Sequence, residues 1–261
     1  ANEIVDSIDV NMMNDVATAN DGGMSLNKVI ALDILSTSIK NGWNRPVYFA
    51  MTVPDDYYLG LSKYMSNSGL AYEITPIITG NGDNIPVNAD KMYDNVMNKF
   101  RWGGIDKVTS PDDIYLDETI RRMVATHRSA MLDLATALYN EGVQADISAE
   151  DYDGEIKENL LKYAKERYEK SLAVVDTMGA KLPTAAAPYS VQIGEIIGDL
   201  YLRLGQALND ETITQKGLDI LESEIRRYAQ YIRYFQSLKP WQYQSLQRTD
   251  RYIAGSYFMS L

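Results

Sequence analysis

Hydrophobic and polar positions follow two different periods along this chain, one before about residue 80 and another after about residue 112. In the first stretch, alternating or continuous apolar runs predict strands at 4–13, 46–53 and 70–78. Apolar residues three and four positions apart predict helices at 25–41 and 57–68. This strand–helix–strand–helix–strand order favours a small α/β layer with right-handed crossovers.

The predicted helix at 25–41 has clear boundary signals. Ser25 can cap its N-terminus, and Asn41-Gly42 supplies a left-handed stop. Trp43 can then fold back on the last turn, as in a Schellman motif. The apolar positions approximate one helical face and are Leu26, Val29, Ile30, Ile34, Leu35 and Ile39.

A turn at Asn44–Pro46 leads from this helix into the next strand, because Pro46 biases the residues before it toward extended backbone. The strand is apolar on both faces, so we expect it to be covered on both sides. Arg45 stands at its entrance beside Trp43, where a cation could bind an anion. The favoured alternative is that Arg45 pairs with a carboxylate or stacks on Trp43, because such structural pairings of arginine are common.

A polar connection separates this layer from the helical part of the chain. Asn88 is a predicted cap for a short helix, which Arg101–Gly104 ends, and Ser110-Pro111 opens a long helical region. The predicted organisation is a small α/β domain at 1–80, a connecting helix and loops at 81–111, and a helical-repeat domain at 112–261.

From about Asp112 onward the apolar period is helical. Helices fit near 112–141, 150–179, 189–208, 211–238 and 240–259. Antiparallel helices joined by short loops suggest an array of the tetratricopeptide type, although no clean 34-residue period emerges. The predicted fold class is therefore α+β, mainly α: a small N-terminal α/β layer followed by a tetratricopeptide-like antiparallel helical array.

The C-terminal helices are rich in tyrosine, tryptophan and arginine, and two interpretations stay open. One is a groove of aromatic platforms for sugars or a peptide. The other is ordinary helical core with a capping face. Tyr228, Ile232 and Phe235 recur at helical spacing, which favours the core interpretation.

Composition excludes several classes of function. The 261 residues carry a net charge of −11, which argues against nucleic-acid binding, and the chain has no cysteine, which excludes disulfides and thiolate metal sites. With one histidine and no cysteine, a transition-metal centre is not expected, and no cofactor is predicted. No apolar run approaches the ~20 residues of a membrane helix. Because the chain begins at Ala1, we expect a processed or excised piece.

No catalytic constellation emerges from the motifs. A Ser-His-Asp triad would have to use His127, which sits on the apolar stripe of a predicted helix and is more often a hydrogen-bonded core residue there. The chain has no phosphate-binding loop, nucleophile elbow or dinucleotide fingerprint. Adjacent carboxylates such as Asp112-Asp113 do not face a common substrate, so a soluble carbohydrate-active enzyme is a weak alternative. No catalytic and no metal-binding residue is predicted.

Two stretches carry a family resemblance. One runs from Leu32 through Asn41-Gly42-Trp43-Asn44-Arg45-Pro46-Val47-Tyr48-Phe49-Ala50 to Tyr72, and the other from Met92 through Arg101-Trp102-Gly103-Gly104 to Met123. Together they resemble the C-terminal soluble region of a bacterial membrane-protein family of unknown function that is similar to protein O-mannosyltransferases. The candidate binding or motif residues are Trp43, Arg45, Tyr48, Tyr93, Asp94, Asn98, Arg101, Trp102, Arg121 and Arg122. We expect Trp43 and Trp102 to be largely buried.

The resemblance implies a piece of a larger protein. Members of that family have an N-terminal bundle of membrane helices similar to GT-C glycosyltransferases, which use lipid-linked sugar donors, and their catalytic acids would lie there. This chain would then be a non-catalytic domain on the periplasmic side of a bacterial inner membrane. It would position an acceptor protein or glycan and reach the membrane through the preceding region. The alternative is a stand-alone helical-repeat scaffold of the cell envelope that binds a protein partner.

Overall fold

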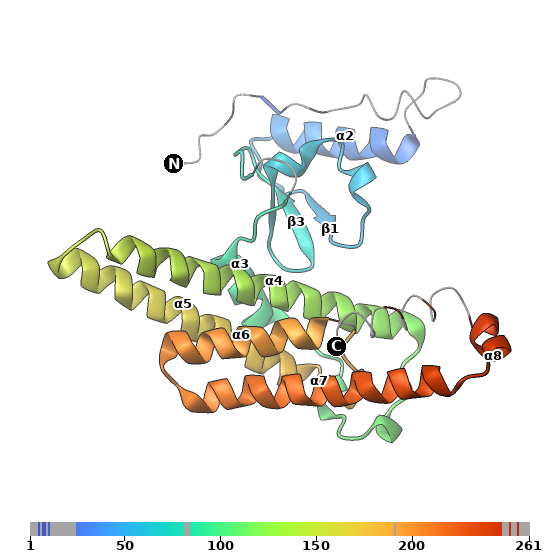
Figure 1. Ribbon diagram of the computed structural model, residues 1–261. Helices are drawn as coiled ribbons and strands as arrows, with labels where there is room; N and C mark the ends of the chain where they lie inside the picture. Colours follow the sequence, from blue (N-terminus) through green and yellow to red (C-terminus); the bar gives the residue numbers. More distant parts are fainter. Residues whose placement is uncertain are drawn as a thin grey trace. The chain divides into compact units, whose positions relative to one another are not determined.

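The computed structural model describes residues 25–80, 84–190 and 192–246, and six single residues outside these ranges, which are Val5, Ser7, Ile8, Val10, Arg251 and Gly255. Over these residues the chain forms seven α-helices and one three-stranded sheet (Figure 1). The fold is therefore α+β and mainly α, as predicted. The chain divides into two compact units, Ala1–Phe100 and Arg101–Leu261.

Helix α2, Leu26–Lys40, ends in the predicted Schellman motif. The Trp43 N–H donates to the Ser38 carbonyl at 2.9 Å, and Gly42 adopts a left-handed backbone with φ +65°. The Ser38 hydroxyl also donates to the Arg45 carbonyl. One buried serine therefore holds both the helix end and the turn that follows it.

The apolar face of α2 is buried over a narrower stripe than predicted. Ser25 precedes the helix, but its side chain makes no capping hydrogen bond. Of the six apolar positions, only Leu35 is buried, and Ala31, four residues earlier, packs beside it against the core of the first unit. The other five are exposed, from 40% at Ile39 to 74% at Leu26, so the broad apolar face is not the packing face.

The sheet of the first unit is antiparallel throughout. Its strands, in the spatial order β1-β3-β2, are β1 (Tyr48–Ala50), β2 (Met65–Asn67) and β3 (Ala71–Ile74). The predicted right-handed crossovers are therefore wrong. The predicted helix at 57–68 is broken at Leu59 and Gly60, whose φ values of 57° and 72° are left-handed, and the chain continues through a 3₁₀ helix, Leu61–Tyr64, into β2.

Strand β1 is shorter than the predicted 46–53 and is not covered on both sides. Tyr48 and Ala50 are exposed, whereas Phe49 is partly buried. The Phe49 ring packs edge-on against the ring of Tyr58, with centroids 5.5 Å apart. Only one face of the strand therefore contributes to the core, which leaves Tyr48 available on the other.

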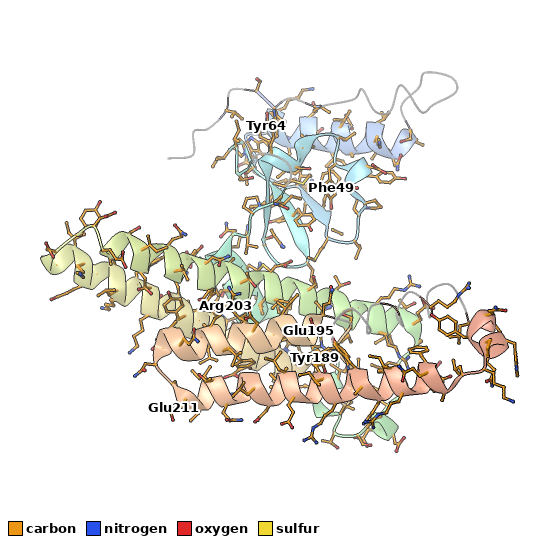
Figure 2. The ribbon with its side chains drawn as sticks, viewed as in Figure 1. Phe49, Tyr64, Tyr189, Glu195, Arg203 and Glu211 are labelled. Atoms are coloured by element: carbon orange, nitrogen blue, oxygen red, sulfur yellow. The ribbon has the colours of Figure 1, made fainter. Side chains whose placement is uncertain are left out.

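The core of the first unit is formed by buried side chains from α2, from residues 58–64 and from β2 and β3. Tyr64 is 2% exposed (Figure 2), and Leu61 and Met65 belong to the same cluster. The Val5 N–H donates to the Pro76 carbonyl at 2.9 Å. Most of the strand predicted at 4–13 lies outside the described residues.

Helix α3, Ala89–Asp94, begins at the predicted cap, where the Asn88 side chain accepts a hydrogen bond from a backbone N–H of the first turn. The helix continues as a π-helical turn over Asn95–Lys99. Met92 and Val96, four positions apart, are buried. The opposite side of this segment is therefore free to line a groove.

The second unit contains four long helices joined mostly by short loops, and consecutive helices among the four pack against each other (Figure 1). They begin after the predicted 112, because Pro111–Asp113 forms a capped 3₁₀ turn and Asp117 caps the first helix. Residues beyond Ser245 that were predicted as helix to 259 lie almost entirely outside the described residues. The helices are α4 (Glu118–Ala149), α5 (Gly154–Lys181), α6 (Ile193–Leu208), α7 (Glu211–Ser237) and α8 (Pro240–Ser245).

Within the described ranges, no helix is both long enough and apolar enough to cross a bilayer. The tetratricopeptide-like arrangement and the division into 1–80, 81–111 and 112–261 stay predictions.

The aromatic residues of the C-terminal helices divide between core and surface. Tyr228 is 1% exposed, and its hydroxyl accepts a hydrogen bond from the Gln192 N–H at 3.1 Å. Tyr234 and Trp241 are exposed, at 54% and 65%. The core interpretation therefore holds for Tyr228, whereas the other two rings remain accessible.

Gly42→Val is expected to lower the free energy of unfolding by about 1 kcal/mol or more, because a β-branched residue is strained in the left-handed backbone of the helix cap. Gly179→Ala is the matched control, since an added Cβ at this position of α5 meets no atom within 4 Å and alanine favours the helix. Urea unfolding of both variants makes the comparison. Equal midpoints for Gly42→Val and the parent chain would contradict the strained cap.

The cap of α7 makes stability depend on pH. The Asp210 carboxylate accepts from the Thr212 hydroxyl at 2.6 Å and from the Thr212 N–H at 2.8 Å. These hydrogen bonds lower the pKa of Asp210. A carboxyl whose pKa is lowered on folding stabilises the protein above its unfolded pKa, and the contribution is lost as the pH falls through the folded pKa.

Asp210→Ala should therefore lower the melting temperature at neutral pH, and its deficit against the parent chain should shrink below pH about 3.9, the ordinary aspartate pKa. Thermal melts across this range measure the difference. A deficit that stays constant down to the lowest pH would show that the charge of Asp210 does not act through the cap.

Candidate functional site

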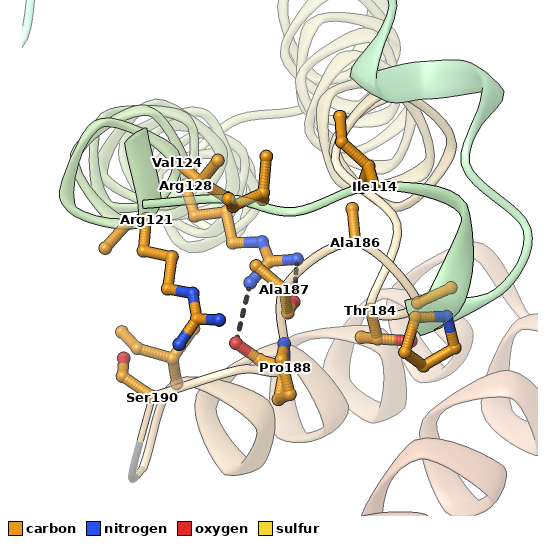
Figure 3. A pocket seen from close by; sticks show the side chains of 14 residues that line it. Ile114, Arg121, Val124, Arg128, Thr184, Ala186, Ala187, Pro188 and Ser190 are labelled. Atoms are coloured by element: carbon orange, nitrogen blue, oxygen red, sulfur yellow. Dashed lines mark hydrogen bonds between the residues drawn. The ribbon is translucent and has the colours of Figure 1, made fainter. Parts of the chain in front are cut away.

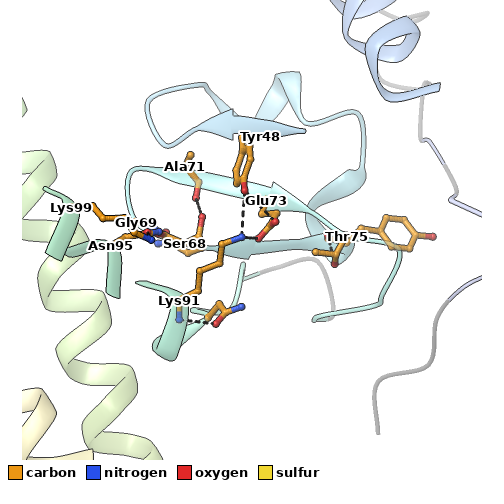
Figure 4. A network of polar contacts seen from close by, with 12 residues as sticks. Tyr48, Ser68, Gly69, Ala71, Glu73, Thr75, Lys91, Asn95 and Lys99 are labelled. Atoms are coloured by element: carbon orange, nitrogen blue, oxygen red, sulfur yellow. Dashed lines mark hydrogen bonds and ion pairs between the residues drawn. The ribbon is translucent and has the colours of Figure 1, made fainter. Parts of the chain in front are cut away.

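An open groove lies beside the sheet of the first unit, and we call it the sheet groove. Its volume is about 470 Å³. Its walls combine aromatic rings with hydroxyl, amide and ammonium groups (Figure 4). The lining residues are Tyr48, Ser68, Leu70, Ala71, Lys91, Asn95, Lys99 and Phe100.

One wall of the sheet groove comes from three residues spaced by four positions, Lys91, Asn95 and Lys99, which places them on one side of the helical segment. The Asn95 amide donates to the Ser68 carbonyl at 2.7 Å, and Lys99 Nζ donates to Asn95 Oδ1 at 2.9 Å. The segment is thereby tied to the turn between β2 and β3.

The opposite wall centres on Tyr48. Its hydroxyl donates to Glu73 Oε1 at 3.2 Å and accepts from Lys91 Nζ at 3.3 Å, and Lys91 also pairs with Glu73 Oε2 (Figure 4). Burial lowers the pKa of Lys91, but the hydrogen bonds to Glu73 and Tyr48 outweigh it, and the pKa is raised overall. Lys91 is therefore a charged, fixed donor at neutral pH.

The second cation of the groove is also paired. Lys99 Nζ forms an ion pair with Asp94, and the Asn98 amide donates to the same carboxylate at 2.8 Å. The hydrogen bond from Lys99, followed by that from Asn98, lowers the pKa of Asp94. The groove therefore offers donors, acceptors and rings to a ligand.

Three further predicted residues lie elsewhere in the first unit. Trp43 is partly buried and packs against the core of this unit. Arg45 is exposed and makes neither an ion pair nor a stacking contact with Trp43 within the described residues. Tyr93 is partly buried on α3.

The second unit contains a pocket of about 430 Å³ between the start of α4 and the connection from α5 to α6, which we call the arginine pocket (Figure 3). Arg121 and Arg128 extend into it from α4, and apolar residues make up most of the remaining wall. Arg121 was predicted as a candidate binding residue, whereas Arg128 was not.

Arg128 is 3% exposed and donates to four backbone carbonyls of the α5–α6 connection. The distances are 2.7 Å to Leu182 and to Ala187, 3.0 Å to Pro188 and 3.3 Å to Pro183. Its guanidinium also lies 4.7 Å from the centroid of the Tyr189 ring. Burial lowers the pKa of Arg128.

A buried ion pair lies behind this connection. Glu224 is 5% exposed and pairs with Arg227, whose guanidinium also donates to the Tyr189 carbonyl at 2.6 Å. Burial raises the pKa of Glu224 more than Arg227 lowers it. Tyr189 therefore contacts Arg128 through its ring and Arg227 through its backbone carbonyl.

The remaining predicted residues lie in the second unit outside the pocket. Arg101 is exposed, and Arg122 pairs with Glu118 one turn before it. Trp102 is partly buried, and its ring centroid lies 6.3 Å from that of His127.

His127 makes a local contact on its own helix. His127 Nδ1 lies 2.7 Å from the Met123 carbonyl. In the described ranges, no group of three His, Asp or Glu side chains could hold a metal ion.

Sequence reasoning missed Arg128 and the lysine wall of the sheet groove, although signals existed. Arg128 lies between Val124 and Met131 at helical spacing, and a charged residue on an apolar stripe is a candidate for a buried role. Lys91 and Lys99 share a helix side with Asn95 because of their four-residue spacing. The predicted site residues do not form one cluster. Tyr48 lines the sheet groove, Asp94 and Asn98 form their contacts at the edge of this groove, and Arg121 lines the arginine pocket.

Comparison with known proteins gives one match. The family described as TMEM260-associated domain 2 matches residues 1–93, which include α2, the sheet and Lys91. No curated protein and no solved structure matches the chain. The second stretch of the family resemblance, from Met92 onward, lies almost entirely beyond the matched residues.

Arg128→Met is expected to destabilise the chain by about 3 kcal/mol or more, because buried carbonyls lose charge-assisted hydrogen bonds and gain no other donor. Arg203→Met is the control, since Arg203 is an exposed arginine of α6 paired with Asp199 on its own helix (Figure 2). Loss of the Arg203 guanidinium should lower the free energy of unfolding by at most about 1 kcal/mol. Similar unfolding free energies for the two variants would contradict a stabilising role of the hydrogen bonds between Arg128 and the α5–α6 connection.

Proposed function

We propose that this chain is a non-catalytic domain of a multi-spanning, glycosyltransferase-like membrane protein, where it positions an acceptor protein or glycan. The observation that carries the proposal is the match of residues 1–93 to TMEM260-associated domain 2. TMEM260 is an O-mannosyltransferase-like membrane protein. The resemblance also implies attachment to the membrane through the preceding region and a periplasmic location in a bacterium, and both belong to the proposal.

The sheet groove supports an acceptor-binding role. The Tyr48 ring is 42% exposed and Phe100 lines the same groove, so both can pack against a sugar ring or an apolar side chain. The Tyr48 hydroxyl and the ammonium group of Lys91, whose side chain is 39% exposed, supply polar contacts that a glycan or a polypeptide backbone can use.

The charges of the groove favour binding over chemistry. Lys91 and Lys99 are each held by a carboxylate. The hydrogen bonds to Glu73 and Tyr48 outweigh burial and raise the pKa of Lys91 above its ordinary value. A general base or acid works best when its pKa lies near the operating pH. The groove therefore fits a positioning role better than proton transfer.

A second candidate function is a stand-alone helical scaffold that binds a protein partner in the cell envelope. It is favoured by large apolar side chains exposed on the helices of the second unit, including Ile147, Ile156 and Ile225, each 54–55% exposed. Such a scaffold would bind through the helices and would leave the sheet groove without a role.

Photo-crosslinking separates the two proposals. A benzophenone amino acid at Tyr48 of the full-length protein in cells should form an adduct with a glycoprotein or a polypeptide acceptor. The same probe at Tyr115, 86% exposed in the second unit, should not form that adduct. Tyr48→Ala should reduce recovery of the acceptor about five- to tenfold, the effect of losing one well-packed ring.

Adducts from Tyr115 alone, or equal recovery of the acceptor with Tyr48→Ala and Tyr115→Ala, would contradict acceptor binding in the sheet groove.

A further inference from the structure

We propose that the arginine pocket binds a small organic anion, a carboxylate or phosphate group joined to an apolar body. The proposal concerns the second unit alone and does not rest on the acceptor-binding role of the sheet groove.

Two guanidinium groups face the same pocket. Arg121 and Arg128 are seven positions apart on α4, which places them on one side of the helix two turns from each other. Figure 3 shows both side chains directed toward the segment that contains Pro188 and Ser190. Two cations that share a pocket repel each other, so an anion between them is favoured.

The two arginines have different roles. The terminal N–H groups of Arg128 donate to carbonyls of the α5–α6 connection. Within the described residues, Arg128 is not ion-paired to a carboxylate. It therefore contributes a fixed positive charge, which is worth more to an anion in a buried wall than at the surface. Its buried Nε has no hydrogen-bond partner in the described part of the chain.

Arg121 supplies the directional contacts. It is exposed and forms no ion pair among the described residues, so its guanidinium can form a bidentate pair with a carboxylate or phosphate. The hydroxyls of Thr184 and Ser190 also line the pocket. Ile193, the first residue of α6, lies in the wall, which brings the positive end of that helix dipole to the same place.

The rest of the wall is apolar, which makes a ligand with an apolar body more suitable than a free inorganic ion. Leu116 and Val124 are 4% and 5% exposed, and Ile114 and Ala186 complete this side. A volume of about 430 Å³ falls within the range of small-molecule sites. The charged group would lie at Arg121 and the apolar body against Val124.

Calorimetric titration of the full 261-residue chain tests the proposal with three probes of one chain length: octanoate, octyl phosphate and octanol. At least one anion should bind saturably, and octanol should bind at least tenfold more weakly. Binding of octanoate, of octyl phosphate or of both supports the shared anionic chemistry and identifies the preferred head group. Inorganic phosphate should bind more weakly than octyl phosphate, because it lacks the apolar body.

Arg121→Gln should weaken binding of the anion at least tenfold, while its melting temperature stays that of the parent chain because the side chain is exposed. Arg122→Gln is the matched control, since this neighbouring arginine pairs with Glu118 and does not line the pocket. It should bind the anion within twofold of the parent chain.

Three results would overturn the proposal: no saturable binding of either anion, equal affinity for octanol, or equal weakening by Arg121→Gln and Arg122→Gln. None of them bears on crosslinking at Tyr48, so a failure here is distinguishable from a failure of the proposed function.

Discussion

The buried guanidinium of Arg128 holds the connection between α5 and α6, and the form of the second unit depends on it. Helix α5 ends at Lys181 and α6 begins at Ile193, and the backbone between them forms turns rather than a continuous helix, as where the Ala186 N–H donates to the Pro183 carbonyl at 3.1 Å. Buried carbonyls need donors, and one arginine provides them for four residues of this connection. The same contacts shape the wall of the arginine pocket. Arg128 therefore contributes both to the stability of the unit and to the proposed binding of an anion.

The sheet groove and the arginine pocket differ in how their charged groups are paired. In the sheet groove each lysine has a carboxylate partner, and the surface presents neutral pairs, amides and rings. In the arginine pocket the partners of Arg128 are carbonyl dipoles. They accept hydrogen bonds from its N–H groups but do not neutralise its positive charge. The first arrangement suits an uncharged ligand such as a glycan or peptide backbone. The second suits an anion.

Local signals in the sequence predicted some helix boundaries well, but they failed for the helix at 57–68 and for the first long helix, which ends at Ala149 rather than at 141. Asn41-Gly42 and Asn88 act where the chain was expected to stop or start a helix, because capping depends on a few neighbouring backbone groups. The sheet direction was wrong because Met65–Asn67, predicted as helix, forms β2, and the chain then reverses through residues 68–70 into β3, which the apolar pattern does not encode. Arg128 was missed because its partners lie more than fifty residues away in the sequence.

The central claim, that this chain belongs to a glycosyltransferase-like membrane protein, is tested most directly by the coding sequence upstream of Ala1. The account predicts several apolar segments of about 20 residues, each long enough to span a bilayer, with acidic residues in an early loop. A cleavable signal peptide that ends next to Ala1 would contradict it. The stand-alone scaffold would then be the better account of the helical unit.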